Sequence, residues 1–176
     1  MAAEASDAGQ HSMEHLLGVL VGCSSRESEL VRDAVLAAEK RDPAPFFAHL
    51  RTAATARDTY DDAKAKVLFA RFVRNGTWQA PTLVLGRICE FLSDGSFPDK
   101  AWLNYVPRSV RKRWEENPAF GKPTPEDIAL GKKVFRYNLE LVGKMHKAGV
   151  RILAGTDSSF PCMITDSACM TSSHCW

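Results

Sequence analysis

The chain lacks any long apolar run. None of its 176 residues falls in an uninterrupted apolar stretch of the roughly 18 residues that a membrane-spanning helix needs. The apolar run at residues 16–23 is too short, and no positively charged segment precedes it as in a secretory signal. We therefore expect no membrane span. We expect the chain in the cytoplasm, or in the secretory pathway if a signal peptide lies further upstream.

An excess of charge of one sign is also lacking. Lysine and arginine number 23 against 21 aspartate and glutamate, which gives a net charge of +2. No basic stripe with interleaved aromatic residues runs along the sequence. Nucleic acid is therefore not an expected partner.

The sequence has no Cys-x-x-Cys pair. Its cysteines are five, an odd number, and three of them crowd into the last fifteen residues at spacings that fit no common zinc template. Neither a disulfide framework nor a zinc knuckle is indicated. The remaining composition, 45% hydrophobic and 25% charged, is that of a globular domain with an ordinary core.

A short apolar segment near the C-terminus carries the most specific pattern. Residues 150–154 are rich in β-branched side chains and lie between Gly149 and Gly155, which favours a buried strand of a parallel sheet. Functional groups of α/β proteins follow the carboxyl ends of such strands, where Asp157 stands. An ordinary turn, with Asp157 or Ser158 capping a following helix, is the alternative.

Three segments together resemble the metal-dependent amidohydrolases of the imidazolonepropionase and prolidase-like branch. That family has a Gly-x-x-Ser-Ile-Glu-His segment at its sixth barrel strand, Pro-Thr-Leu at its seventh and Gly-Val-x-Ile-x-x-Gly-Thr-Asp at its eighth. This chain has Gly9 to His15, Pro81 to Leu83 and Gly149 to Asp157 in the same order. The resemblance implies that His15 is a metal ligand and that Asp157 contacts the metal and takes a proton from the attacking water.

The same resemblance implies a fold and a reaction. The fold is α/β: a partial (β/α)8 TIM barrel with strands six to eight and their helices, over residues 1–164. The reaction is hydrolysis of an amide, cyclic amide or dipeptide carbon–nitrogen bond by a water bound to a divalent metal, which we expect to be zinc in the intact enzyme. We expect His15 and Asp157 to point into one common mouth of this barrel.

The family's other ligands are missing. No His-x-His occurs in the sequence, and nothing matches the lysine and histidine of the fourth and fifth strands. A full barrel takes about 250 residues, so we expect a fragment that binds metal weakly and is inactive alone. A non-catalytic helical interaction module is the alternative function, and an open barrel fragment would self-associate or aggregate through its exposed strand edges.

The histidines also allow a local interpretation. If residues 11–15 were helical, His11 and His15 would share one face at the i, i+4 spacing of a metal clip. In the His-Glu-x-x-His motif of zinc proteases the glutamate directly follows the first histidine, which would be position 12 here. The glutamate of this chain is Glu14, so the segment does not match that motif. A structural histidine without metal is a further alternative.

Helical periodicity and end signals predict most of the remaining chain. Residues 1–10 read as a helix end and 12–15 as a very short strand. Helices are predicted from a capping box at Ser24–Glu27 to about 41, over 43–54, from 59–62 to Asn75, and from Thr124 to Lys147. Residues 77–84 are predicted to form a strand, with a helical piece at 87–92.

The long segment at residues 85–122 is a candidate substrate lid, because long loops after barrel strands are usually functional. Trp102 and Tyr105 are candidate pocket walls there, together with Trp114. The simpler alternative is that these aromatic side chains pack the segment against the rest of the domain.

The last residues, 165–176, have no periodicity and many serines and cysteines. One permitted set of codons, read from the third base of the Thr165 codon, gives Gly-Phe-Ser-Leu-His-Asp-Glu-Leu. This is similar to the segment that follows the eighth strand in the amidohydrolases. We expect a disordered, frameshifted tail, and the coding DNA decides the question.

Overall fold

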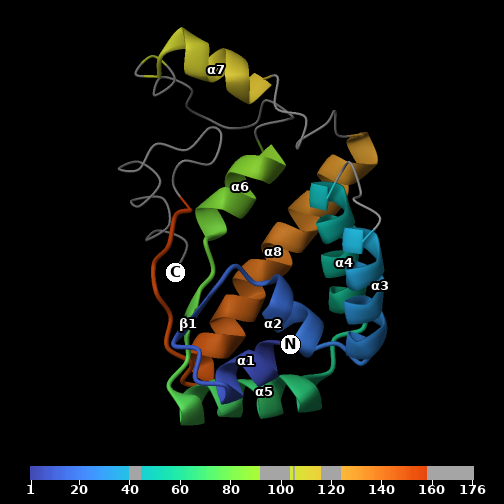
Figure 1. Cartoon of the computed structure of the whole chain (residues 1–176), viewed down its shortest axis with the longest axis vertical. Coiled ribbons are helices and arrows are strands. Elements are labelled where there is room, and N and C mark those ends of the chain that lie inside the picture. Colours follow the sequence, from blue (N-terminus) through green and yellow to red (C-terminus); the bar gives the residue numbers. More distant parts are fainter. Residues whose placement is uncertain (40–44, 92–103, 105, 116–123, 158–176) are drawn as a thin grey trace.

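Helices account for most of the chain in the computed structural model, which describes residues 1–39, 45–91, 104, 106–115 and 124–157 (Figure 1). The elements in order are α1 (Ala2–Asp7), β1 (Ser12–Glu14), α2 (Leu17–Gly22), α3 (Glu27–Glu39), α4 (Pro45–Asp58), α5 (Asp62–Asn75), β2 (Trp78–Ala80), α6 (Leu83–Phe91), α7 (Arg108–Glu115) and α8 (Pro125–Lys147). Within these residues, no helix is both long and apolar enough to cross a membrane.

Helix α8 runs through the middle of the molecule, where it packs along α4 and α6 (Figure 1). Its N-terminus has the predicted cap: the Thr124 side chain accepts a hydrogen bond from the Asp127 backbone, and the Asp127 carboxylate accepts one from the Thr124 backbone. Its buried face joins α2 and α5 in one core, whose most buried large side chains include Leu20, Phe72, Leu141 and Met145.

Helix α5 also begins and ends as its sequence predicts. Asp61 Oδ1 accepts hydrogen bonds from the backbone N–H groups of Ala63 and Lys64, at 2.8 and 3.2 Å. Gly76 ends the helix with φ +67°, the left-handed conformation that glycine adopts at little cost. The Thr77 N–H then donates a hydrogen bond to the Phe72 carbonyl at 2.9 Å, and the next residue begins β2.

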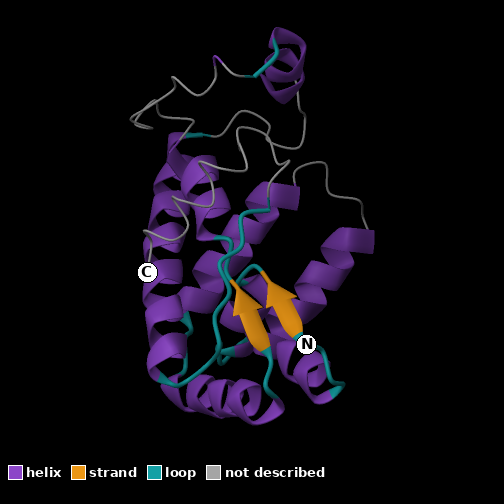
Figure 2. Ribbon diagram, turned by 90° about the vertical axis from the view of Figure 1, so that its left-hand side faces the viewer, coloured by secondary structure: helices purple, strands orange, loops and turns teal. Residues whose placement is uncertain are grey.

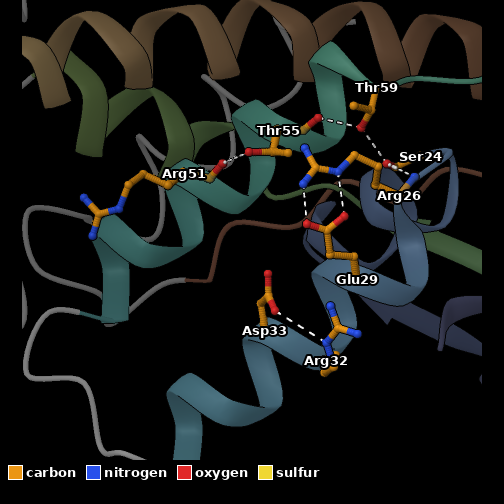
Figure 3. A network of polar contacts seen from close by, with 8 residues as sticks. All are labelled: Ser24, Arg26, Glu29, Arg32, Asp33, Arg51, Thr55 and Thr59. Carbon is orange, nitrogen blue, oxygen red and sulfur yellow. Dashed lines mark hydrogen bonds and ion pairs between the residues drawn. The ribbon is translucent and has the colours of Figure 1, made fainter.

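Polar contacts fasten the turn between α2 and α3 to the end of α4 (Figure 3). The hydroxyls of Ser24 and Thr59 are 2.7 Å apart, and Ser24 Oγ accepts a hydrogen bond from Arg26 N at 3.0 Å. The predicted capping box is wrong in its second half, because the Glu27 carboxylate pairs with Lys64 of α5 at 2.7 Å. Glu27 therefore pairs with a side chain of another helix and not with the backbone at the start of its own helix.

The partial TIM barrel with three strands is wrong. The described residues contain a two-stranded sheet, in which β1 and β2 run parallel with Met13 opposite Gln79 (Figure 2). The third predicted strand, residues 150–154, forms only a single parallel bridge between Ile152 and Gln79. Its backbone makes two hydrogen bonds with Gln79, Gln79 N to Arg151 O at 2.9 Å and Leu153 N to Gln79 O at 2.8 Å.

The second predicted strand is also shorter than expected. Residues 77–84 were predicted as one strand, but β2 ends at Ala80 and α6 begins at Leu83. Pro81 has no N–H to donate to a ladder, and Thr82 takes φ +47°, which turns the chain away from the sheet. A short apolar run does not by itself separate a strand from the first turn of a helix.

Gln79 is a buried polar residue at the centre of the sheet. It is 0% exposed, its neighbours across the sheet are Met13 and Ile152, and its side-chain Nε2 and Oε1 have no hydrogen-bond partner among the described residues. A buried amide without partners costs free energy that an apolar side chain of similar size does not. The buried amide of Gln79 therefore lowers the stability of the sheet.

Replacing this side chain should stabilise the protein. We expect Gln79→Met to raise the free energy of unfolding by about 1–3 kcal/mol, because it removes the desolvation cost of the amide. Urea denaturation measures the change. Gln10→Met, at an exposed position, is the control and should stay within about 0.5 kcal/mol of the wild type. A Gln79→Met protein no more stable than the wild type would contradict the argument.

Candidate functional site

Strained backbone marks the residues that follow the three parallel segments. Among the described residues, the non-glycine positions with positive φ are His15 at 63°, Thr82 at 47° and Asp157 at 53°. Such conformations cost roughly 1–3 kcal/mol each and cluster at functional sites, and a β-branched threonine there is an outlier. The same three residues line one cavity, so the strain is concentrated at one place in the fold.

His15 is held from its backbone and from its ring. Its N–H donates to the Ala80 carbonyl at 2.9 Å, which continues the β1–β2 pairing by one residue. Its Nδ1 lies 2.8 Å from the Thr82 hydroxyl. The other ring nitrogen, Nε2, has no hydrogen-bond partner in the described part of the chain. In the tautomer whose Nδ1–H donates to the Thr82 hydroxyl, Nε2 carries a lone pair and can act as a ligand or base.

Asp157 reaches the same cavity from the segment that follows the Ile152 bridge. This segment passes close to the end of β2: a Cβ added to Gly155 would lie 3.3 Å from Thr82 Cγ2 and 3.4 Å from Ala80 Cβ. A side chain at position 155 would crowd the Thr82 methyl group, which would have to move by a few tenths of an ångström. Gly155 therefore brings the Asp157 carboxylate, which is exposed, to the cavity that His15 and Thr82 border.

The cavity has a volume of about 430 Å³, within the range of small-molecule sites. Its polar lining residues are His15, His49, Thr82, Asn138 and Asp157. Its other walls are apolar and come from α2 (Leu17, Leu20), α4 (Leu50, Ala53), α6 (Leu85, Gly86) and α8 (Val134, Phe135). A mostly apolar hollow with a few polar groups is the usual form of a binding site.

The described residues do not complete a metal centre. Catalytic zinc takes three protein ligands and a water, whereas the described chain holds no group of three or more histidine, cysteine, aspartate or glutamate residues that could bind a metal. His15, His49 and Asp157 are of the ligand types required and border the same cavity, but they do not form such a group. The arrangement fits part of such a site and not the whole.

The metal clip of His11 and His15 does not form. It required a helix, but residues 12–14 are the strand β1. An extended segment rises about 3.3 Å per residue, so residues four apart are roughly 13 Å from each other. That separation is too large for a shared metal ion.

Cys23 is a further candidate nucleophile that the fold excludes. It is a free thiol with 0% exposure. Burial, followed by the nearby Glu27 carboxylate, raises the pKa of the thiol to about 12. The group is therefore protonated at neutral pH and closed to substrates.

Sequence reasoning missed the part that Thr82 takes in the site. The Pro-Thr-Leu segment drew attention to the position, but no role followed from it until His15 and Thr82 were found in contact. His49 of α4 is exposed and also borders the cavity. The candidate pocket walls Trp102 and Tyr105, and the predicted tail at residues 165–176, lie outside the described residues.

Comparison with known proteins identifies no relative: no family model, no curated protein and no solved structure matches this chain.

Proposed function

We propose that this chain carries part of the active site of a hydrolase that acts on carbon–nitrogen bonds of amides, cyclic amides or dipeptides, related to the metal-dependent amidohydrolases. One observation supports the proposal most directly. His15, Thr82 and Asp157, from the ends of three parallel segments, meet at one cavity in strained backbone conformations. Strain of this kind is retained where the geometry of a site requires it.

The proposal gives each side chain a role. Thr82 holds Nδ1 of His15, and this contact directs Nε2 away from the hydroxyl. His15 would be a ligand of a divalent metal, most simply zinc, and Asp157 a second ligand and the acceptor of a proton from water. Since a further protein ligand is needed, we propose that the metal is held only together with residues from outside the described chain.

A non-catalytic interaction module is the competing function. The observation that favours it is the lack of a three-ligand group in the described part of the chain. Apolar side chains exposed on α3 and α5, among them Val35, Leu36 and Val67, would support association with another protein or with a second copy.

The hydrolase and the interaction module differ in what the upstream DNA should encode. A His-x-His in frame, within the length missing from a barrel, supports the hydrolase, and an unrelated start supports the module.

The isolated chain should be inactive. We expect the purified 176-residue protein to hold far less than one zinc per chain and to turn over no amide, cyclic amide or dipeptide, because two ligands bind zinc weakly. Metal analysis by plasma mass spectrometry and an amine-release assay measure the two quantities. Stoichiometric zinc with turnover would contradict the proposed incomplete site, and upstream DNA without a His-x-His would contradict the hydrolase itself.

A further inference from the structure

The side chains that line the cavity beside His15, Thr82 and Asp157 indicate which kind of substrate it would bind. Beyond these residues and the polar side chains of His49 and Asn138, the lining is apolar: leucines from α2, Leu50 and Ala53 from α4, and Val134 and Phe135 from α8. Leu50, Ala53, Val134 and Phe135 are all buried, so these walls belong to the core and are fixed by its packing. The space is therefore shaped for a group that gains from leaving water.

The charges around the cavity disfavour an acidic group along its apolar walls. No lysine or arginine is among the described residues that line it, and its one ionisable carboxylate is Asp157. Away from the metal that His15 and Asp157 would hold, a substrate carboxylate would lose its hydration without gaining a lysine or arginine partner. A neutral group avoids this penalty.

The size of the space sets the scale of the group. An apolar cavity of about 150 Å³ holds a benzene ring, and this cavity measures about 430 Å³. We infer that the cavity is a specificity pocket for a neutral aromatic or branched aliphatic group next to the scissile carbon–nitrogen bond. The inference rests on the proposed function and names the substrate class of the same site.

Two neutral amides that differ in one side chain test the inference on the protein as it exists. N-acetyl-phenylalaninamide and N-acetyl-glycinamide are titrated into the 176-residue chain, and their binding is followed by chemical-shift changes in NMR spectra. We expect the phenylalanine compound to bind roughly tenfold more tightly or better, because it buries a benzyl group that the glycine compound lacks. Equal affinities for the two compounds would overturn the inference.

Substitutions that narrow the cavity locate the binding. Ala53→Met fills the α4 wall, and Leu85→Trp fills the α6 wall at a half-buried position that tolerates a larger side chain more easily. Each should weaken the phenylalanine compound at least about fivefold by occupying its space. Ala34→Met, at an exposed position of α3, is the matched control and should leave the affinity unchanged. Unchanged affinity in both folded cavity variants would place the binding elsewhere and overturn the inference.

Failure of the inference and failure of the proposed function can be told apart. Preference for the phenylalanine compound combined with upstream DNA lacking a His-x-His would keep the apolar pocket and reject the hydrolase. An in-frame His-x-His combined with equal binding of both compounds would keep the hydrolase and reject this substrate class.

Discussion

The substitution Phe72→Ala should lower the free energy of unfolding by about 3–5 kcal/mol. Phe72 is 0% exposed on the buried face of α5, in the core shared with α2 and α8. Removing the ring loses its burial and leaves a cavity in a part of the molecule that is closely packed. Its carbonyl accepts the N–H of Thr77, so the same residue also sets the point at which the chain enters β2. Urea denaturation followed by circular dichroism measures the loss.

Val73→Ala is the matched control for this prediction. Val73 is the next residue of the same helix and is 46% exposed. Its truncation should change the free energy of unfolding by no more than about 0.5 kcal/mol, since little burial is lost and alanine favours the helix. Similar effects of the two substitutions would show that α5 does not present Phe72 to a common core.

The helices could be predicted because their signals are local. Gly76 after α5, and Thr124 with Asp127 at the start of α8, each act within one helical turn. Hydrophobic periodicity then identified most of the buried residues of α5 and α8, but not those of α3, where Val35 is 51% exposed. The short helix α2 was missed because its six residues are too few to show a period.

The sheet could not be predicted in the same way, because pairing depends on partners far away in the sequence. Residues 150–154 have the composition of a strand, yet only Ile152 pairs, and Leu153 is 39% exposed. Residues 77–84 also read as a strand, and their second half begins α6 instead. The resemblance to a barrel drew on the same short runs and carried the same error into the fold.

Sequence reasoning selected two residues of the candidate site, but it did not predict their geometry. His15 and Asp157 were selected from motifs 142 positions apart, and the structure places both at one cavity. The left-handed backbone shared by His15, Thr82 and Asp157 was not predicted: a turn was an alternative only at Asp157, and no glycine or turn signal marks His15 or Thr82. The contact between His15 and Thr82 likewise depends on the parallel register of β1 and β2.

This geometry links stability to function. Three strained residues at one cavity together cost several times the roughly 1–3 kcal/mol of a single one, and Gln79 adds a buried amide without partners beneath them. Core residues such as Phe72 must offset that cost for the three side chains to stay in place. A variant that relaxes the backbone at the cavity should therefore gain stability and lose the arrangement of His15 and Asp157.

The second large effect concerns Asp157. In an active protein that contains this chain, Asp157→Asn should lower kcat by roughly 100- to 10,000-fold, the range for loss of a general base. A carboxylate accepts a proton from water at neutral pH, and a carboxamide does not. Asparagine also tolerates the positive φ of 53° at this position better than most residues do. The substitution therefore changes the chemistry of the group and keeps its backbone.

Asp33→Asn provides the control, because Asp33 lies on α3 with its side chain 60% exposed and paired with Arg32 next to it. It should leave kcat and KM unchanged. Urea denaturation of both variants separates chemistry from folding, since Asp157→Asn should unfold within about 0.5 kcal/mol of the parent while its kcat falls. An Asp157→Asn enzyme that keeps most of its kcat would remove the carboxylate from the reaction and leave His15 and the apolar cavity as a binding site alone.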